Sequence, residues 1–123
     1  MILTEDTGHG DYRIRAYEPG SITINETTYT HSLIITPTQL IPHWPPRSLK
    51  ELTATHCQAI LALKPEIIIL GTGIKFVMPP ASQLALLYQH KLGVECMDTG
   101  AACRTFTALM SEGRNVVAAL LIE

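Results

Sequence analysis

Three short apolar runs in the second half of the chain, each preceded by a segment with helical periodicity, most constrain its fold. The runs are EIIIL, VECMD and NVVAALLI, which begin at Glu66, Val94 and Asn115. Such short apolar runs are typical of strands that are buried on both faces. The preceding segments repeat apolar residues every three or four positions, as amphipathic helices do. Residues 47–123 are therefore predicted to fold as α-β-α-β-α-β, an alternation that builds a parallel or mixed sheet covered by helices.

Proline and glycine bound the three predicted helices. The first ends at Pro65, the second begins at Pro79-Pro80 and ends at Gly93, and the third follows the DTG motif and stops at Gly113. Proline suits the first turn of a helix, and glycine suits the position just after its last turn. The apolar face of the second helix is predicted to comprise Ala81, Leu84, Ala85 and Tyr88.

The first part of the chain has a different pattern. From Tyr12 onward, polar and apolar residues alternate in short runs separated by Pro19-Gly20, which predicts a hairpin or meander of strands. Four prolines between Pro37 and Pro46 exclude a central strand there and predict an edge strand or a rigid connection. The fold class is therefore α/β with an additional β-rich N-terminal part.

Length and composition exclude several classes of protein. The 123 residues suffice for a single domain, with residues 1–11 expected to be flexible, 12–46 β-rich and 47–123 alternating. A net charge of −2 without any Lys/Arg cluster in the sequence argues against a nucleic-acid partner. We expect neither a secretory signal nor a transmembrane segment, because no apolar run is long enough. Three cysteines without a CxxC pair indicate reduced thiols and a cytoplasmic protein, with Cys57 and Cys96 in the core.

The segment DTGAACR, residues 98–104, carries the most suggestive motifs. Its first four residues match the active-site loop of aspartic proteases, but those enzymes hold the aspartate in an all-β body, and here a helical segment follows. The spacing also matches a cysteine phosphatase loop, yet Asp98 stands where the thiolate nucleophile would be, and its carboxylate would repel phosphate. We therefore expect Asp98 or Thr99 to cap the third helix with a side-chain oxygen.

Arg104 and Cys103 in this segment each have two possible roles. Arg104 lies opposite the predicted apolar stripe of the helix. It either pairs with a carboxylate such as Asp98 or Glu95, which we favour, or faces an anionic or protein partner. Cys103 lies near a helix N-terminus, which can lower a thiol pKa. With no histidine nearby in the sequence to act as a base, packing beneath the first turn is the favoured interpretation.

Gly71-Thr72-Gly73 follows the first strand of the alternating part, where a dinucleotide-binding loop would lie. The full pattern needs a third glycine at position 76, which is Phe76, so nucleotide binding is weakly supported. Ligands of such sheets bind at the carboxyl ends of the strands, which brings this loop and residues 98–104 together as a candidate crevice. The candidate binding residues are Gly71, Thr72, Gly73, Asp98, Thr99, Cys103 and Arg104.

The combination of these motifs resembles a known family. PEIIILGTG, then GVECMDTGAACRTF, then EGR and a small-apolar final strand are similar to small uncharacterised bacterial and archaeal proteins whose eukaryotic relative is mitochondrial respiratory complex I assembly factor 3. The resemblance covers residues from about 12 to 122 and implies a three-layer domain whose central mixed, largely parallel sheet carries helices, with extra β structure on the other side. The chain departs from the pattern at Thr107, where asparagine is usual, and at 74–76, where the loop is usually more polar.

Two functions remain open at this point. The resemblance implies a non-enzymatic interaction or assembly-type factor with a protein partner, and we also consider a homodimer. The alternative is a small-molecule, anion-binding protein or enzyme that uses the crevice between the loops 71–73 and 98–104. No catalytic residue is assigned. The five histidines lack the spacing of metal ligands, so neither a metal nor another cofactor is expected.

Overall fold

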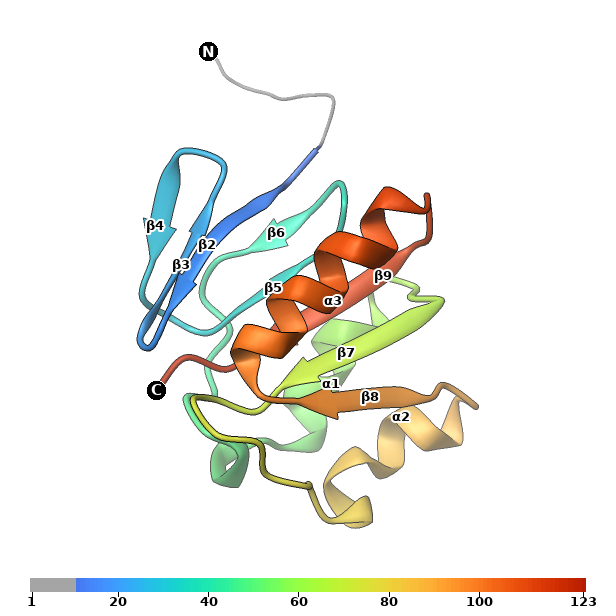
Figure 1. The fold of residues 1–123 in the computed structure, drawn as a ribbon. Helices are drawn as coiled ribbons and strands as arrows, with labels where there is room; N and C mark the ends of the chain where they lie inside the picture. The colour runs from blue at the N-terminus through green and yellow to red at the C-terminus, as the bar shows by residue number, and fades with distance from the viewer. Residues whose placement is uncertain (1–10) are drawn as a thin grey trace.

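The computed structural model describes residues 11–123, which form two β-sheets and three α-helices (Figure 1). The flexibility expected for residues 1–11 concerns positions that, apart from Asp11, lie outside the described residues. The smaller sheet is antiparallel and comprises β2 (Ile14–Glu18), β3 (Ser21–Ile24) and β4 (Thr27–Tyr29), in that order. Gly20 and Asn25 adopt positive φ values of 93° and 53° in the two connecting turns, a conformation that these residue types tolerate best.

The larger sheet is mixed and has the strand order β6-β5-β9-β7-β8. Its strands are β5 (Leu33–Ile35), β6 (Leu40–Ile41), β7 (Ile67–Gly71), β8 (Val94–Met97) and β9 (Val116–Leu120). β7 pairs in parallel with β8 and β9, whereas β5 is antiparallel to β6 and β9. The proline-rich segment contributes β6 at the edge of the sheet, where missing backbone N–H groups interrupt no central ladder.

The helices connect the strands of the second half as the alternation predicted. They are α1 (Ala54–Leu61), preceded by the 3-10 turn η1 (Leu49–Glu51), α2 (Ala85–Gln89), preceded by η2 (Ala81–Leu84), and α3 (Thr99–Ser111). The second helix is shorter than predicted: it ends at Gln89, and Lys91, not Gly93, has a positive φ after it. Its predicted apolar face is also partly wrong, because Leu87 is buried and Tyr88 is exposed. The 3-10 turn at the start of this segment has fewer residues per turn than an α-helix. Spacing that assumes an α-helix throughout therefore predicts the wrong residues for the buried face.

The larger sheet has an apolar core on each face. Along β9, Val117 and Ala119 pack with α1 and α2, whereas Ala118 and Leu120 pack with α3 and the smaller sheet. Figure 1 shows α3 and the strands β2–β4 on one side of the larger sheet and α1 on the other. The α/β fold with a mixed central sheet and an additional N-terminal β layer is confirmed. The consequence for function is that α3 starts at the carboxyl ends of β7 and β8, packs on β7 and β9, and also contacts β2 of the added β layer.

Candidate functional site

The carboxyl ends of β7 and β8 meet the start of α3 in a joint that comprises residues 71–73 and 98–101. The Thr72 amide donates to the Met97 carbonyl over 2.8 Å and so joins the ends of the two strands. Gly71 has no space for a side chain, because a Cβ atom there would lie 2.9 Å from Thr99 Oγ1 and 3.0 Å from Thr99 Cα. The glycine of this loop therefore serves close packing between β7 and α3.

Thr99 holds the joint together with both its backbone and its side chain. Its amide donates to the Gly73 carbonyl over 2.8 Å. Its hydroxyl accepts a hydrogen bond from the Gly73 amide at 2.8 Å and donates to the Leu121 carbonyl at 2.9 Å. Thr99 is fully buried, so these bonds satisfy polar groups that have no access to water. The loop after β7, the start of α3 and the end of β9 are thereby fixed to one another.

Asp98 caps α3, as predicted: its Oδ1 accepts a hydrogen bond from the Ala101 amide at 2.9 Å. Thr72 has a similar local role, because its hydroxyl accepts from the Val77 amide at 3.0 Å and donates to the Lys75 carbonyl at 2.9 Å. Thr72 therefore fixes the shape of the loop that follows the joint.

Cys103 lies beneath the first turns of α3 and is 4% exposed. Burial raises the pKa of its thiol to about 12, an effect that the Arg104 guanidinium opposes and the Asp98 carboxylate reinforces. A thiol with this pKa stays protonated at neutral pH, and the thiolate is the nucleophilic form. The packing interpretation of Cys103 therefore agrees with its surroundings.

Arg104 lies on the outer side of α3 and is exposed. The one ion pair within residues 11–123 joins Arg13 to Asp11 at 3.8 Å, so the expected pair of Arg104 with Asp98 or Glu95 is wrong. Asp98 is instead turned toward the helix backbone, where its cap bond holds it. Arg104 lines a cavity of about 430 Å³ between α3 and β2.

The structure thus brings five of the seven candidate residues together in the joint and separates the other two. The five are Gly71, Thr72, Gly73, Asp98 and Thr99. Cys103 points into the core and Arg104 away from it, toward β2. The binding role of all seven stays a prediction.

Sequence reasoning missed an exposed apolar segment directly after the joint, residues 74–78, which we call the apolar loop. Four of its five side chains are large, apolar and about half exposed or more: Ile74 (52%), Phe76 (50%), Val77 (49%) and Met78 (68%). The signal was present in the departure of residues 74–76 from the usual polar loop, but without a periodic pattern it did not predict exposure.

Within residues 11–123, no group of three His, Cys, Asp or Glu side chains is arranged to hold a metal ion. None of the helices in the same residues combines the length and the apolar character needed to cross a bilayer.

Comparison with known proteins identifies the family. The model of a family described as "Protein of unknown function (DUF498/DUF598)" matches residues 14–121. The chain belongs to this family. The resemblance predicted from the motifs is confirmed: the chain is 31% identical over 110 residues to the zebrafish (Danio rerio) protein named NADH dehydrogenase (ubiquinone) 1 alpha subcomplex assembly factor 3. That match covers 88% of this chain and 63% of the zebrafish protein, so the chain spans less than two thirds of its length.

Two other proteins are similar to this chain over almost the whole length of both chains. A Francisella tularensis protein named "13 kDa major membrane protein" is 31% identical over 117 residues, which are 94% of this chain and 95% of that protein. A crystal structure of a Bordetella parapertussis protein superposes with a TM-score of 0.85 at 35% identity and covers 93% of this chain and 98% of that one. The architecture described above is therefore shared with a solved relative.

Proposed function

We propose that this DUF498/DUF598 protein is a non-enzymatic, assembly-type factor that acts in the cytoplasm by binding other proteins. The observation that carries the proposal is the apolar loop, residues 74–78, four of whose side chains are exposed. Exposed apolar patches commonly mark sites where a protein contacts another protein or a membrane. The relatives named as assembly factors support a protein as the partner.

The backbone of the apolar loop is held in place before any partner binds. The Thr72 hydroxyl bonds to the Lys75 carbonyl and the Val77 amide, and Thr72 itself is buried in the joint. A preformed loop loses less conformational entropy on binding than a mobile one.

The alternative, a small-molecule or enzymatic role in the crevice between the two loops, has less support. The backbone groups that would bind a ligand there are bonded within the chain through Gly73 and Thr99. The one cysteine of the segment, Cys103, has a thiol whose pKa is raised to about 12. Both observations favour a structural role for the joint and a binding role for the surface beside it.

Site-specific cross-linking in cells tests the proposal. A photoreactive phenylalanine analogue at Phe76 should give discrete adducts with one or a few proteins. The same analogue at Tyr88, which is 46% exposed and outside the apolar loop, is the control and should give none. The double variant Phe76→Ser/Met78→Ser should lose the partner without loss of thermal stability, because both side chains are exposed.

Two outcomes would contradict this proposal. One is the absence of protein adducts at position 76 together with unchanged levels of membrane complexes in a deletion strain. The other is flotation of the purified protein with lipid vesicles that depends on Phe76 and Met78, since the apolar loop would then contact a bilayer. The name of the Francisella relative makes that second outcome worth measuring.

A further inference from the structure

Strand β2 and helix α3 run antiparallel to each other, with one cavity between them and a second where the chain enters β2 and leaves α3. The first, about 430 Å³, is lined by residues 14–17 of β2 and by Gly100, Cys103, Arg104 and Thr107 of α3. The second, about 480 Å³, is lined by Asp11 and Arg13 before β2, by Pro37, and by Met110, Ser111, Gly113 and Arg114 at and after the end of α3. The residues of the second cavity directly precede β2 and lie at or just after the end of α3, so the second cavity follows the first along the same two segments. We refer to the two cavities together as the β2–α3 groove.

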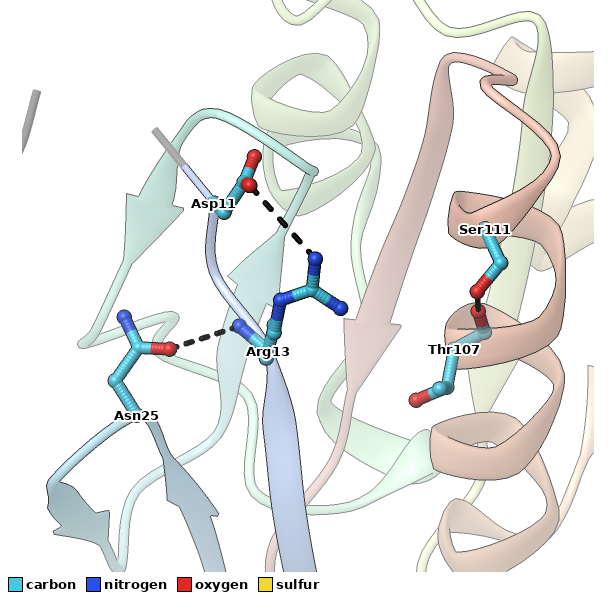
Figure 2. Close-up of polar contacts among 5 residues, drawn as sticks. All are labelled: Asp11, Arg13, Asn25, Thr107 and Ser111. Atoms are coloured by element: carbon cyan, nitrogen blue, oxygen red, sulfur yellow. Dashed lines mark hydrogen bonds and ion pairs between the residues drawn. The ribbon is translucent and has the colours of Figure 1, made fainter. Parts of the chain in front are cut away.

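Figure 2 shows the end of this groove nearest the start of β2. Asp11 and Arg13 lie on one wall, and Thr107 and Ser111 lie on the other. Arg13 is anchored by its backbone, since its amide donates to Asn25 Oδ1 at 3.0 Å. Thr107 and Ser111 direct their hydroxyls to backbone carbonyls of α3, at 3.0 and 2.9 Å. The polar side chains drawn here therefore bond within their own wall and not across the groove.

The β2–α3 groove concentrates the positive charge of a chain whose net charge is −2. Four of the five arginines in the sequence line it: Arg13, Arg15, Arg104 and Arg114. Asp11, beside Arg13, is the one acidic side chain among its lining residues in the described part of the chain. Guanidinium groups without carboxylate partners favour an occupant with several negative charges along its length.

The shape of the groove favours an extended chain over a small anion. From Asp11 to Tyr17 the β2 wall is about 20 Å long at the usual rise of a strand, which is more than one carboxylate or phosphate group spans. β2 is also an outer strand of the smaller sheet, so one edge of its backbone is free of β-sheet pairing. A free strand edge beside a groove is a site where an extended peptide can add as a further strand.

We propose that the β2–α3 groove binds an extended acidic segment of a partner protein, alongside β2, with its carboxylates toward Arg15, Arg104 and the two arginines of the second cavity. The inference rests on the proposed protein-binding function but concerns a surface separate from the apolar loop. Single-stranded RNA is a weaker candidate, because such sites stack bases on exposed aromatic rings. The one aromatic side chain of the groove, Tyr17, packs against Gly100 at the closed end.

Fluorescence anisotropy with labelled peptides of defined sequence tests the inference. The probe is a peptide of about seven residues with alternating Val and Glu, long enough to follow β2. A Val–Lys peptide of the same length and a labelled oligouridine are the comparison ligands. The Val–Glu peptide should bind, the Val–Lys peptide should not, and binding should weaken as salt is raised.

Variants locate the binding. Arg15→Ala/Arg104→Ala should weaken binding of the Val–Glu peptide about tenfold, at about threefold for each exposed charge pair. Arg47→Ala is the matched control, since Arg47 is the one arginine outside the groove, and it should bind as the unaltered protein does. Phe76→Ser/Met78→Ser should also bind the Val–Glu peptide normally. A negative result for the apolar loop as a contact site would therefore not change the result for the groove. Slowed hydrogen exchange of β2 amides should accompany binding.

Several results would overturn the inference. These are equal binding of the Val–Lys peptide, tighter binding of oligouridine, an equal loss in Arg47→Ala, or no binding of the Val–Glu peptide at millimolar concentration. Full displacement of the peptide by free citrate at similar affinity would replace the acidic segment by a small anion. Slowed exchange in β2 that depends on protein concentration without peptide would replace it by a second copy of this chain.

Discussion

The joint and the β2–α3 groove differ in every property that governs binding, although α3 contributes to both. The joint, at the carboxyl ends of β7 and β8, is where α/β sheets commonly bind ligands, yet its polar groups are bonded to one another through Thr99. The groove lies on the flank of α3, and within residues 11–123 none of its arginines except Arg13 has a carboxylate partner. The groove that is available for binding is therefore created by the added N-terminal β layer and not by the ends of the strands.

The largest effect is expected from a substitution at the most crowded point of the joint. Gly71→Ala places a Cβ atom 2.9 Å from Thr99 Oγ1 and 3.0 Å from Thr99 Cα, so the backbone of α3 must move. We expect a loss of about 3 kcal/mol in the free energy of unfolding, as for overpacked cores. Urea denaturation followed by circular dichroism measures it.

Gly93→Ala is the matched control for this substitution. No heavy atom lies within 4 Å of a Cβ built at Gly93, and its φ is not positive, so the change should alter stability by less than about 0.5 kcal/mol. Equal stability losses for the two glycines would mean that close packing is not the reason for glycine at position 71.

The second-largest effect is expected from a substitution that removes the hydroxyl of Thr99 and keeps the shape of the side chain. Thr99→Val leaves the Gly73 amide and the Leu121 carbonyl without this buried partner, which should cost about 2 kcal/mol. Thr27→Val, at an exposed position of β4, should cost nothing measurable. Chemical denaturation measures both variants. A Thr99→Val protein as stable as the unaltered one would show that the joint is held by packing alone.

The smallest effect sharpens the contrast between Cys103, which faces the core, and Arg104, which faces the groove. Burial raises the pKa of the Cys103 thiol from 9.0 to about 12. Between these values the unfolded chain releases this proton and the folded chain keeps it, so stability is complete below pH 9 and falls as the pH rises. At pH 10 the loss from this one group is about 1.4 kcal/mol relative to pH 7.

Urea midpoints at pH 7 and pH 10 check this prediction. Burial also raises the pKa values of Cys57, Cys96 and Tyr17, which act in the same direction, so the difference between variants is the informative quantity. Cys103→Ala should reduce the loss between the two pH values, and Arg104→Ala should leave most of it. An unchanged pH dependence in Cys103→Ala would contradict the burial of an ionisable thiol there.

Much of the fold was predictable, because strands buried on both faces and amphipathic helices leave clear patterns. EIIIL and NVVAALLI are the paired strands β7 and β9, and Asp98 caps α3 as its position before the helical segment implied. The second helix was predicted less well, since a 3-10 turn precedes it and exposes Tyr88. The partner of Arg104 was mispredicted, because sequence distance cannot tell that the Asp98 carboxylate is already used in the cap.

The amino-acid sequence by itself determined the alternation of strands and helices and the family of this protein, since these follow from local periodicity and from short motifs. The residue pattern predicted a parallel or mixed sheet, and the antiparallel pairing of β5 with β9 made it mixed. The basic groove was decided by the tertiary structure alone. No cluster of basic residues appears in the sequence, because Arg13 and Arg15 are separated from Arg104 by about ninety positions. They line one groove only because the smaller sheet packs beside α3, where charges that are distant along the chain come to share one surface.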